Sequence, residues 1–464
     1  MRLIGRSFLG AIIALGLVLP ARAETLADTL VSAYNNSGLL EQNRALLRAA
    51  DEDTAIALSR LRPILNWTAD LTRTKVDANN GVTSRNFNQT DMNAGITASL
   101  LLYDFGRTRF QLDAAKETVL ATRNALISAE QQVLFRAVQA HVNVRRNIRF
   151  VELRENNLNL LRQELRAAED RFEVGEVTRT DVAQAEASVA GALSGLAIAQ
   201  GDLLQAVEEY RSAVGRDPGT LRSTTRLPNL SGDVAAAKSV AVRKHPDIRR
   251  AQNDIAAAEL NVLAADAAMK PTFSLQGRVG SNDELFNESN SLTSSIGVNA
   301  SGPIYQGGAL SATKRRAVAQ SDSLRAVLHL VQLQVQQDVG NAYARLRAAR
   351  AGVTSSEEQV RAARVAFQGV REEATLGART TLDVLDAEQE LLDAEANLIS
   401  AQSDVTIAAY AVVSSIGELT ARDLRLDVQI YDPMAYYNLV KDAPVAKSKQ
   451  GRQLDKVLQS IGKY

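Results

Sequence analysis

The chain has 464 residues, with 53 basic and 53 acidic side chains and no cysteine. This charge balance excludes the basic surface of a nucleic-acid-binding protein, and the absence of cysteine excludes disulfides, thiolate metal sites and thiol nucleophiles. Aromatic residues make up only 5% of the chain, which argues against a large globular core.

Residues 1–23 have the pattern of a secretory signal peptide. Two arginines precede an apolar run over 8–19, and the small residues Ala21 and Ala23 fit a cleavage site. The run of about 12 residues is shorter than the roughly 20 of a membrane-spanning helix, which favours a cleaved signal over a retained anchor. No cysteine follows the signal to carry a lipid, and no later segment has about 18 consecutive apolar residues, so we predict no transmembrane helix.

The rest of the chain is a duplication. With an offset of 202 residues the second half matches the first without a gap over roughly a hundred residues. The matched positions include Tyr103 and Tyr305, Gly106 and Gly308, Gly175 and Gly377, Thr178 and Thr380, Asp181 and Asp383, Glu186 and Glu388, and Gly215 and Gly417. Such a long period predicts two large halves that pack once, side by side.

We expect a first structural repeat over 24–232, a second over 233–417, and a partly disordered C-terminal tail over 418–464. Each repeat opens with an amphipathic helix, at 39–61 and at 247–270. Two strands follow in each repeat, then a very long helix, a glycine turn and a returning helix.

Four segments alternate apolar and polar residues and predict strands with one apolar and one polar face. They lie near 65–72, 93–100, 273–279 and 295–301. Each is about ten residues long, which fits a tilted membrane strand, and the polar faces are mostly small and uncharged, which disfavours a hairpin on a soluble core. The intervening segments 75–91 and 281–293 are rich in Asn and Ser and predict loops. A barrel needs at least about eight strands, so several chains must contribute to one barrel.

The helices make up the bulk of the chain. From Gly106 to Phe172 no residue breaks the helical pattern, which predicts about 100 Å of helix. Apolar residues recur every seven positions, as in a coiled-coil seam. The returning helix is about half as long, so we expect the opening helix of each half to stack on it end to end. A soluble coiled-coil scaffold explains the heptads, but not the signal peptide together with the paired strands.

The turn between each long helix and its returning helix has a defined chemistry. Gly175 can adopt the left-handed conformation that ends a helix, and Thr178 and Asp181 follow at capping-box spacing. The second half repeats this pattern at 377, 380 and 383. Helix capping alone is one interpretation of these residues, and a functional role is the other.

These features together resemble the TolC family of outer-membrane exit ducts over essentially the whole mature chain. The strand-to-helix junctions at 102–106 and 304–308 and the turns at 171–182 and 375–387 carry the resemblance. It implies a mainly α fold with membrane β-strands, in which three chains share one twelve-stranded barrel in the outer membrane. Their helices form a hollow α-barrel across the periplasm, closed at its far end by the turns, and the tail lies at the equator.

The same resemblance implies the residues of a gate. Asp383 and Asp386 match acidic residues that ring the closed entrance in similar proteins. Arg379 matches an arginine that holds the entrance shut by bonding to neighbours at the positions of Thr180 and Asp181. Six carboxylates around one axis raise some pKa values and attract cations.

The resemblance also marks one departure and one docking surface. A tyrosine often found in the gate would fall at Ala374, so we expect a looser closed state. The turns are expected to dock a periplasmic adaptor through Val174, Gly175, Thr178, Leu376, Gly377 and Thr380.

The implied function is that of an exit duct in a tripartite export machine of a Gram-negative bacterium. Its partners would be an adaptor, an inner-membrane ABC or RND pump and outer-membrane lipid, with no nucleic acid. We expect no enzyme activity, cofactor or metal, because phosphate loops and nucleophile elbows are missing and the histidines His141, His245 and His329 are scattered. The tail resembles those of type I protein secretion ducts, and the missing lipid cysteine favours the same function. Multidrug efflux is the alternative.

Overall fold

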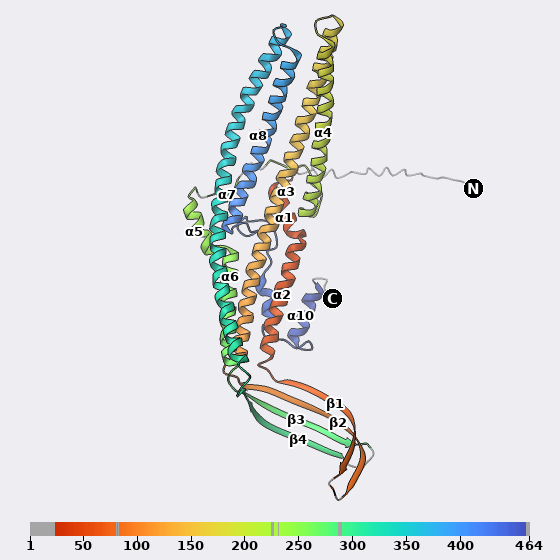
Figure 1. The fold of residues 1–464 in the computed structure, drawn as a ribbon, viewed down its shortest axis with the longest axis vertical. Helices are drawn as coiled ribbons and strands as arrows, with labels where there is room; N and C mark the ends of the chain where they lie inside the picture. The colour runs from red at the N-terminus through yellow and green to blue at the C-terminus, as the bar shows by residue number, and fades with distance from the viewer. Residues whose placement is uncertain are drawn as a thin grey trace, which may run out of the picture.

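The structure is a computed structural model that describes residues 24–79, 81, 83–223, 227–230, 232–285 and 290–460. The predicted signal peptide lies outside the described residues. The molecule is elongated, with helices along most of its length and one sheet at one end (Figure 1). Two helical hairpins end at the opposite end of the molecule, so the sheet and the hairpin tips lie at the two ends of its long axis.

The two halves contain the same elements in the same order. The first half comprises α1 (Leu26–Asn36), α2 (Gly38–Ser59), β1 (Ile64–Asn79), β2 (Ser84–Tyr103), α3 (Arg107–Glu173) and α4 (Arg179–Val214). The second half comprises α5 (Val234–Lys244), α6 (Pro246–Ala267), β3 (Thr272–Glu284), β4 (Asn290–Ser301), α7 (Ala309–Thr375) and α8 (Thr381–Ile416), and the tail contains α9 (Pro433–Val440) and α10 (Lys449–Ser460). The matched lengths confirm the duplication: 67 residues in α3 and α7, 36 in α4 and α8, and 22 in α2 and α6.

The four strands form one antiparallel sheet in the order β1-β2-β3-β4. The register aligns the apolar rows, because Trp67 pairs with Ile96, Ile96 pairs with Val279, and Leu275 pairs with Val298. All four rows therefore lie on one face of the sheet. Side chains on this face remain open, with Trp67 79% and Ile296 80% exposed. An apolar face of this extent requires lipid or protein to cover it.

The strands are longer than predicted, and the two predicted loops are wrong. β1 runs to Asn79 and β2 begins at Ser84, so most of 75–91 is paired strand. Likewise β3 runs to Glu284 and β4 begins at Asn290, which places most of 281–293 in the sheet. Alternating polarity marks a strand only where one face is apolar. At the far ends of these strands the side chains are polar on both faces of the sheet, so the sequence does not alternate there. The backbones of neighbouring strands are still paired.

The predicted end-to-end stacking is confirmed in both halves. Asn36, at the boundary of α1 and α2, donates from Nδ2 to the carbonyl oxygen of Val214 at the end of α4, at 3.2 Å. In the second half Gly417, which caps α8, lies against His245, which caps α6. Each half is thus one continuous long helix beside a column of two shorter helices.

The junctions need glycine, and this makes a testable prediction. Gly215 has a φ of 84°, and a Cβ there would lie 2.6 Å from Cβ of Asn36. Gly215→Ala should lower the free energy of unfolding by about 2–3 kcal/mol through left-handed strain and the clash. Gly191→Ala is the matched control, since Gly191 lies inside α4 with open space around it. It should stabilise by about 0.5–1 kcal/mol. Thermal unfolding followed by circular dichroism compares the two, and equal melting temperatures would contradict the prediction.

The hairpins pack as the heptads predict. Along α4 the buried alanines Ala185, Ala192, Ala199 and Ala206 recur every seven residues. Ala192 packs against Leu158 and Leu161 of α3, and its small side chain allows the helices to approach closely. In the part of the chain that the structure describes, α4 is also the one helix long and apolar enough to cross a membrane by composition. That composition combines these buried alanines with exposed residues such as Ile198 and Leu204.

Candidate functional site

The two hairpin tips are capped by the duplicated threonine and aspartate. The backbone N of Thr178 donates to Oδ2 of Asp181 at 2.8 Å, and the backbone N of Asp181 donates back to Oγ1 of Thr178 at 3.4 Å. Thr380 and Asp383 repeat this box at 2.9 and 3.2 Å. The predicted capping boxes are therefore present at both tips, and they fix the direction in which each carboxylate points.

Each tip also presents one glycine and one apolar side chain. Gly175 and Gly377 have φ angles of 79° and 74°, and nothing lies within 4 Å of the Cβ position of either. The preceding residues Val174 and Leu376 are 71% and 85% exposed. Each tip therefore presents one exposed apolar side chain beside its glycine, among exposed charged residues such as Glu176 and Arg379.

Asp383 and Asp386 lie near each other in the first turns of α8. The backbone N–H and the hydroxyl of Thr380 both donate to the Asp383 carboxylate, and they hold its pKa below the ordinary value. Crowding of carboxylates was expected to raise such values, but within one chain capping has the opposite effect. Asp383 therefore stays charged as the pH falls, and Asp386 is exposed beside it.

The residues predicted to form a gate do not bond to one another in the predicted way within one chain. Nε of Arg379 donates to Oε2 of Glu373 in its own tip at 2.9 Å, and both side chains are exposed. Thr180 and Asp181 belong to the other tip, and the carboxylate of Asp181 caps α4. Within the described residues no hydrogen bond or ion pair joins Arg379 to either of them. Such a bond requires a neighbouring copy or a shift of the tips.

A hollow lies where the gate tyrosine of similar proteins would fall. Ala374 packs with Phe367 and Val384, and Leu160 of α3 borders this cluster. Beside it is a cavity of about 130 Å³, whose wall includes Ala374 and Arg371. The small side chain at 374 thus leaves space between the two hairpins near their tips.

A buried polar contact between the hairpins was not predicted. Nδ2 of Asn157 on α3 donates to Oε1 of Glu388 on α8 at 2.7 Å, and Glu388 is only 3% exposed. Burial is the main cause that raises the pKa of Glu388 to about 7. The signal was present in the sequence, because Glu388 is spaced with the buried Leu385 and Leu392 along one face of the helix.

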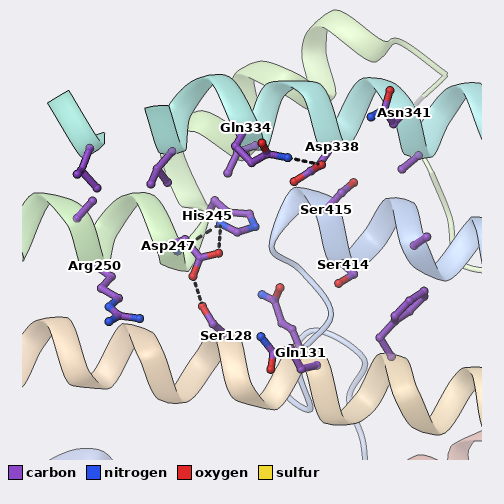
Figure 2. A pocket seen from close by; sticks show the side chains of 18 of the residues that line it. Ser128, Gln131, His245, Asp247, Arg250, Gln334, Asp338, Asn341, Ser414 and Ser415 are labelled. Carbon is purple, nitrogen blue, oxygen red and sulfur yellow. Dashed lines mark hydrogen bonds and ion pairs between the residues drawn. The ribbon is translucent and has the colours of Figure 1, made fainter. Parts of the chain in front are cut away.

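A second polar region lies beside the junction of α6 and α8, in a cavity of about 640 Å³ between α3 and α7 (Figure 2). There Oγ of Ser128 donates to Oδ1 of Asp247 at 2.6 Å, and Nδ1 of His245 accepts from the backbone N of Asp247 at 3.2 Å. His141, which lies elsewhere in the chain, is buried and its Nδ1 forms a hydrogen bond with Oγ1 of Thr29.

Across the described ranges no three His, Asp or Glu side chains form a group that could hold a metal ion. His141 and His245 have structural partners.

Two parallel 67-residue helices, a sheet with an open apolar face and two capped tips define a channel protein of the outer membrane that extends into the periplasm. The chain belongs to the outer membrane efflux protein family, whose model matches residues 29–216 and 239–418. Members of this family are channels and not enzymes.

Individual relatives agree with this assignment. The outer membrane efflux protein BepC of Brucella suis biovar 1 is 36% identical over 437 residues, which cover 93% of this chain and 94% of BepC. The outer membrane protein TolC of Vibrio cholerae is 28% identical over 433 residues, 87% of this chain and 92% of that protein. The solved structure of the outer-membrane channel OprN covers 84% of this chain and 89% of its own, with a TM-score of 0.74 at 24% identity, and confirms the fold.

Proposed function

We propose that the chain is the exit duct of a tripartite export machine and that it works as a homotrimer. The observation that carries this proposal is the sheet: four strands whose apolar rows share one open face cannot close into a barrel alone, whereas three copies supply twelve strands. Exposed apolar residues on α4 and α7, among them Leu204 and Leu330, give each copy further surface for its neighbours. Channels of this kind are homotrimers.

The partners follow from the two ends of the duct. The apolar face of the sheet contacts outer-membrane lipid. The tips, where Val174 and Leu376 are exposed, bind a periplasmic adaptor that links the duct to an inner-membrane pump. In the resting trimer Asp383 and Asp386 ring the entrance, and Arg379 bonds to Thr180 and Asp181 across neighbouring hairpins.

For the substrate we propose protein secretion of the type I kind, driven by an ABC pump. The chain has no cysteine after the signal to carry a lipid, and its tail resembles those of type I ducts. Multidrug efflux is the second candidate, and it is favoured by the relatives, because BepC is named an efflux protein and OpmQ of Pseudomonas aeruginosa is named for pyoverdine export.

Deletion of the gene and complementation with the full chain test the proposal. Outer-membrane fractions should contain a heat-modifiable trimer, and pull-down with the chain should recover an adaptor and its pump. Loss of specific proteins from the culture supernatant, with drug sensitivity unchanged, supports type I secretion. Increased drug sensitivity with an unchanged supernatant supports efflux instead. A soluble periplasmic monomer would contradict the duct itself.

A further inference from the structure

We propose that a buried contact between α3 and α8, the hydrogen bond of Asn157 to Glu388 supported by the ion pair of Glu164 with Arg371, is a latch that holds the two hairpins of each chain together. The latch rests on the proposed function, because it matters only if the hairpins move when the duct opens.

The latch joins the two hairpins within the half nearest the tips. Asn157 and Glu388 are both buried, and their side chains meet at 2.7 Å between α3 and α8. On the tip side of this bond, Nε of Arg371 on α7 lies 3.2 Å from Oε1 of Glu164 on α3. Leu385 packs against α3 beside the bond, so the contact is enclosed by apolar groups. Separating the hairpins therefore breaks one buried and one half-buried polar contact together.

The position of the latch explains how this chain can close without the gate tyrosine. At Ala374 the hairpins leave a hollow, and Arg379 binds within its own tip. Within one chain the described polar contacts between the two hairpins therefore lie deeper than the tips, and they add to the bonds proposed for Arg379 in the trimer. A deeper contact controls the same motion, because both hairpins are continuous helices in this region.

Glu388 makes the latch sensitive to protons. Its Oε2 is buried and has no hydrogen-bond partner within the chain as described. Facing it are Asn157 and Glu164 from α3 and Arg371 from α7, while α4 contributes the apolar Ala192 to the adjoining cluster. Burial and, to a smaller degree, Glu164 raise the pKa of Glu388 from 4.5 to about 7, against the opposing effects of Asn157 and Arg371.

The sign of the pH effect follows from this raised pKa. The closed latch binds a proton more tightly than separated hairpins, in which Glu388 is solvated. The latch is therefore fully stable below the solvated pKa, and it weakens as the pH rises through about 7. Between about pH 5.5 and 8.5 the ratio of open to closed states should rise by up to about 30-fold per chain.

Conductance of the purified full-length trimer in a planar bilayer, titrated from acid to alkaline pH, tests the sensor. Wild type should open more as the pH rises, and Glu388→Gln should lose that dependence, because glutamine keeps the shape and the bond but cannot ionise. Glu390→Gln is the matched control, since Glu390 is exposed on the same helix. It should behave as wild type. If Glu388→Gln retains the wild-type pH dependence, the latch is overturned.

A crosslink tests the motion independently of pH. The chain has no cysteine, so Asn157→Cys with Glu388→Cys provides the only thiols. A short homobifunctional maleimide is the reagent, because a direct disulfide needs Cα atoms within about 7 Å. Crosslinked trimers should not open, whereas the same protein without reagent should conduct. Unchanged conductance after complete crosslinking overturns the latch, while failure of the wild-type chain to form a trimeric pore overturns the proposed function.

Discussion

Replacing both Asp383 and Asp386 with asparagine is expected to weaken the block of the closed duct by divalent and trivalent cations by roughly 100-fold. In a trimer the change removes six negative charges from one ring. Asparagine retains the size of aspartate and can still accept from Thr380, so the cap of α8 should survive. The measurement is single-channel conductance in a planar bilayer while the cation is titrated.

The pH dependence of the block checks the same assignment. Because Thr380 holds the pKa of Asp383 below its ordinary value, the block should persist as the pH falls to about 5. Asp393→Asn with Asp404→Asn is the control, since it removes the same charge from exposed positions further along α8. The control should leave the block intact. If both double variants lose the block equally, the effect is one of overall charge and the ring is misassigned.

Arg379→Ser is expected to open the resting duct and to raise its conductance several-fold. Within the described part of one chain the ion-pair partner of Arg379 is Glu373, and an exposed pair of this kind contributes little to folding. The variant should therefore form trimers as stable as wild type. A change in conductance would then result from the loss of the bonds to Thr180 and Asp181 across neighbouring hairpins. It would not result from unfolding of the chain.

Arg179→Ser is the matched control for this experiment. Arg179 is an exposed arginine in the other tip, next to Thr180 in the chain. The substitution Arg179→Ser removes the same charge from the same end of the duct. This control should keep the wild-type conductance. If both variants open equally, the total positive charge at the tips keeps the duct closed. A specific bond of Arg379 would then not be the cause.

The sequence predicted the long elements because a strong physical signal defines each of them. The uninterrupted heptads of α3 and α7 and the glycine turns placed both hairpins to within a residue or two. The Thr178–Asp181 and Thr380–Asp383 boxes were predicted from spacing alone, because capping depends only on local geometry. The duplication supported these predictions, because the same elements were expected at matching positions in both halves.

Other parts of the fold lack such a local signal. α1, α5, α9 and α10 have between 8 and 12 residues, too few to form a stable helix without packing against the rest of the chain. The strand ends were missed because both of their faces are polar. The contact between Asn157 and Glu388 joins residues 231 positions apart, so only the three-dimensional arrangement shows that they meet.

The break between α8 and α6, matched by that between α4 and α2, has a mechanical consequence. At both breaks one helix ends and the next begins at nearly the same height, while α3 and α7 continue past them (Figure 1). Each break is a natural pivot, and the 36-residue helix beyond it is a lever arm of about 54 Å. A tilt of about 10° at the pivot then swings the tip by about 9 Å. If the hairpins of the proposed duct tilt at these breaks, a small rotation at mid-height would move the tips far and leave the sheet at the other end in place.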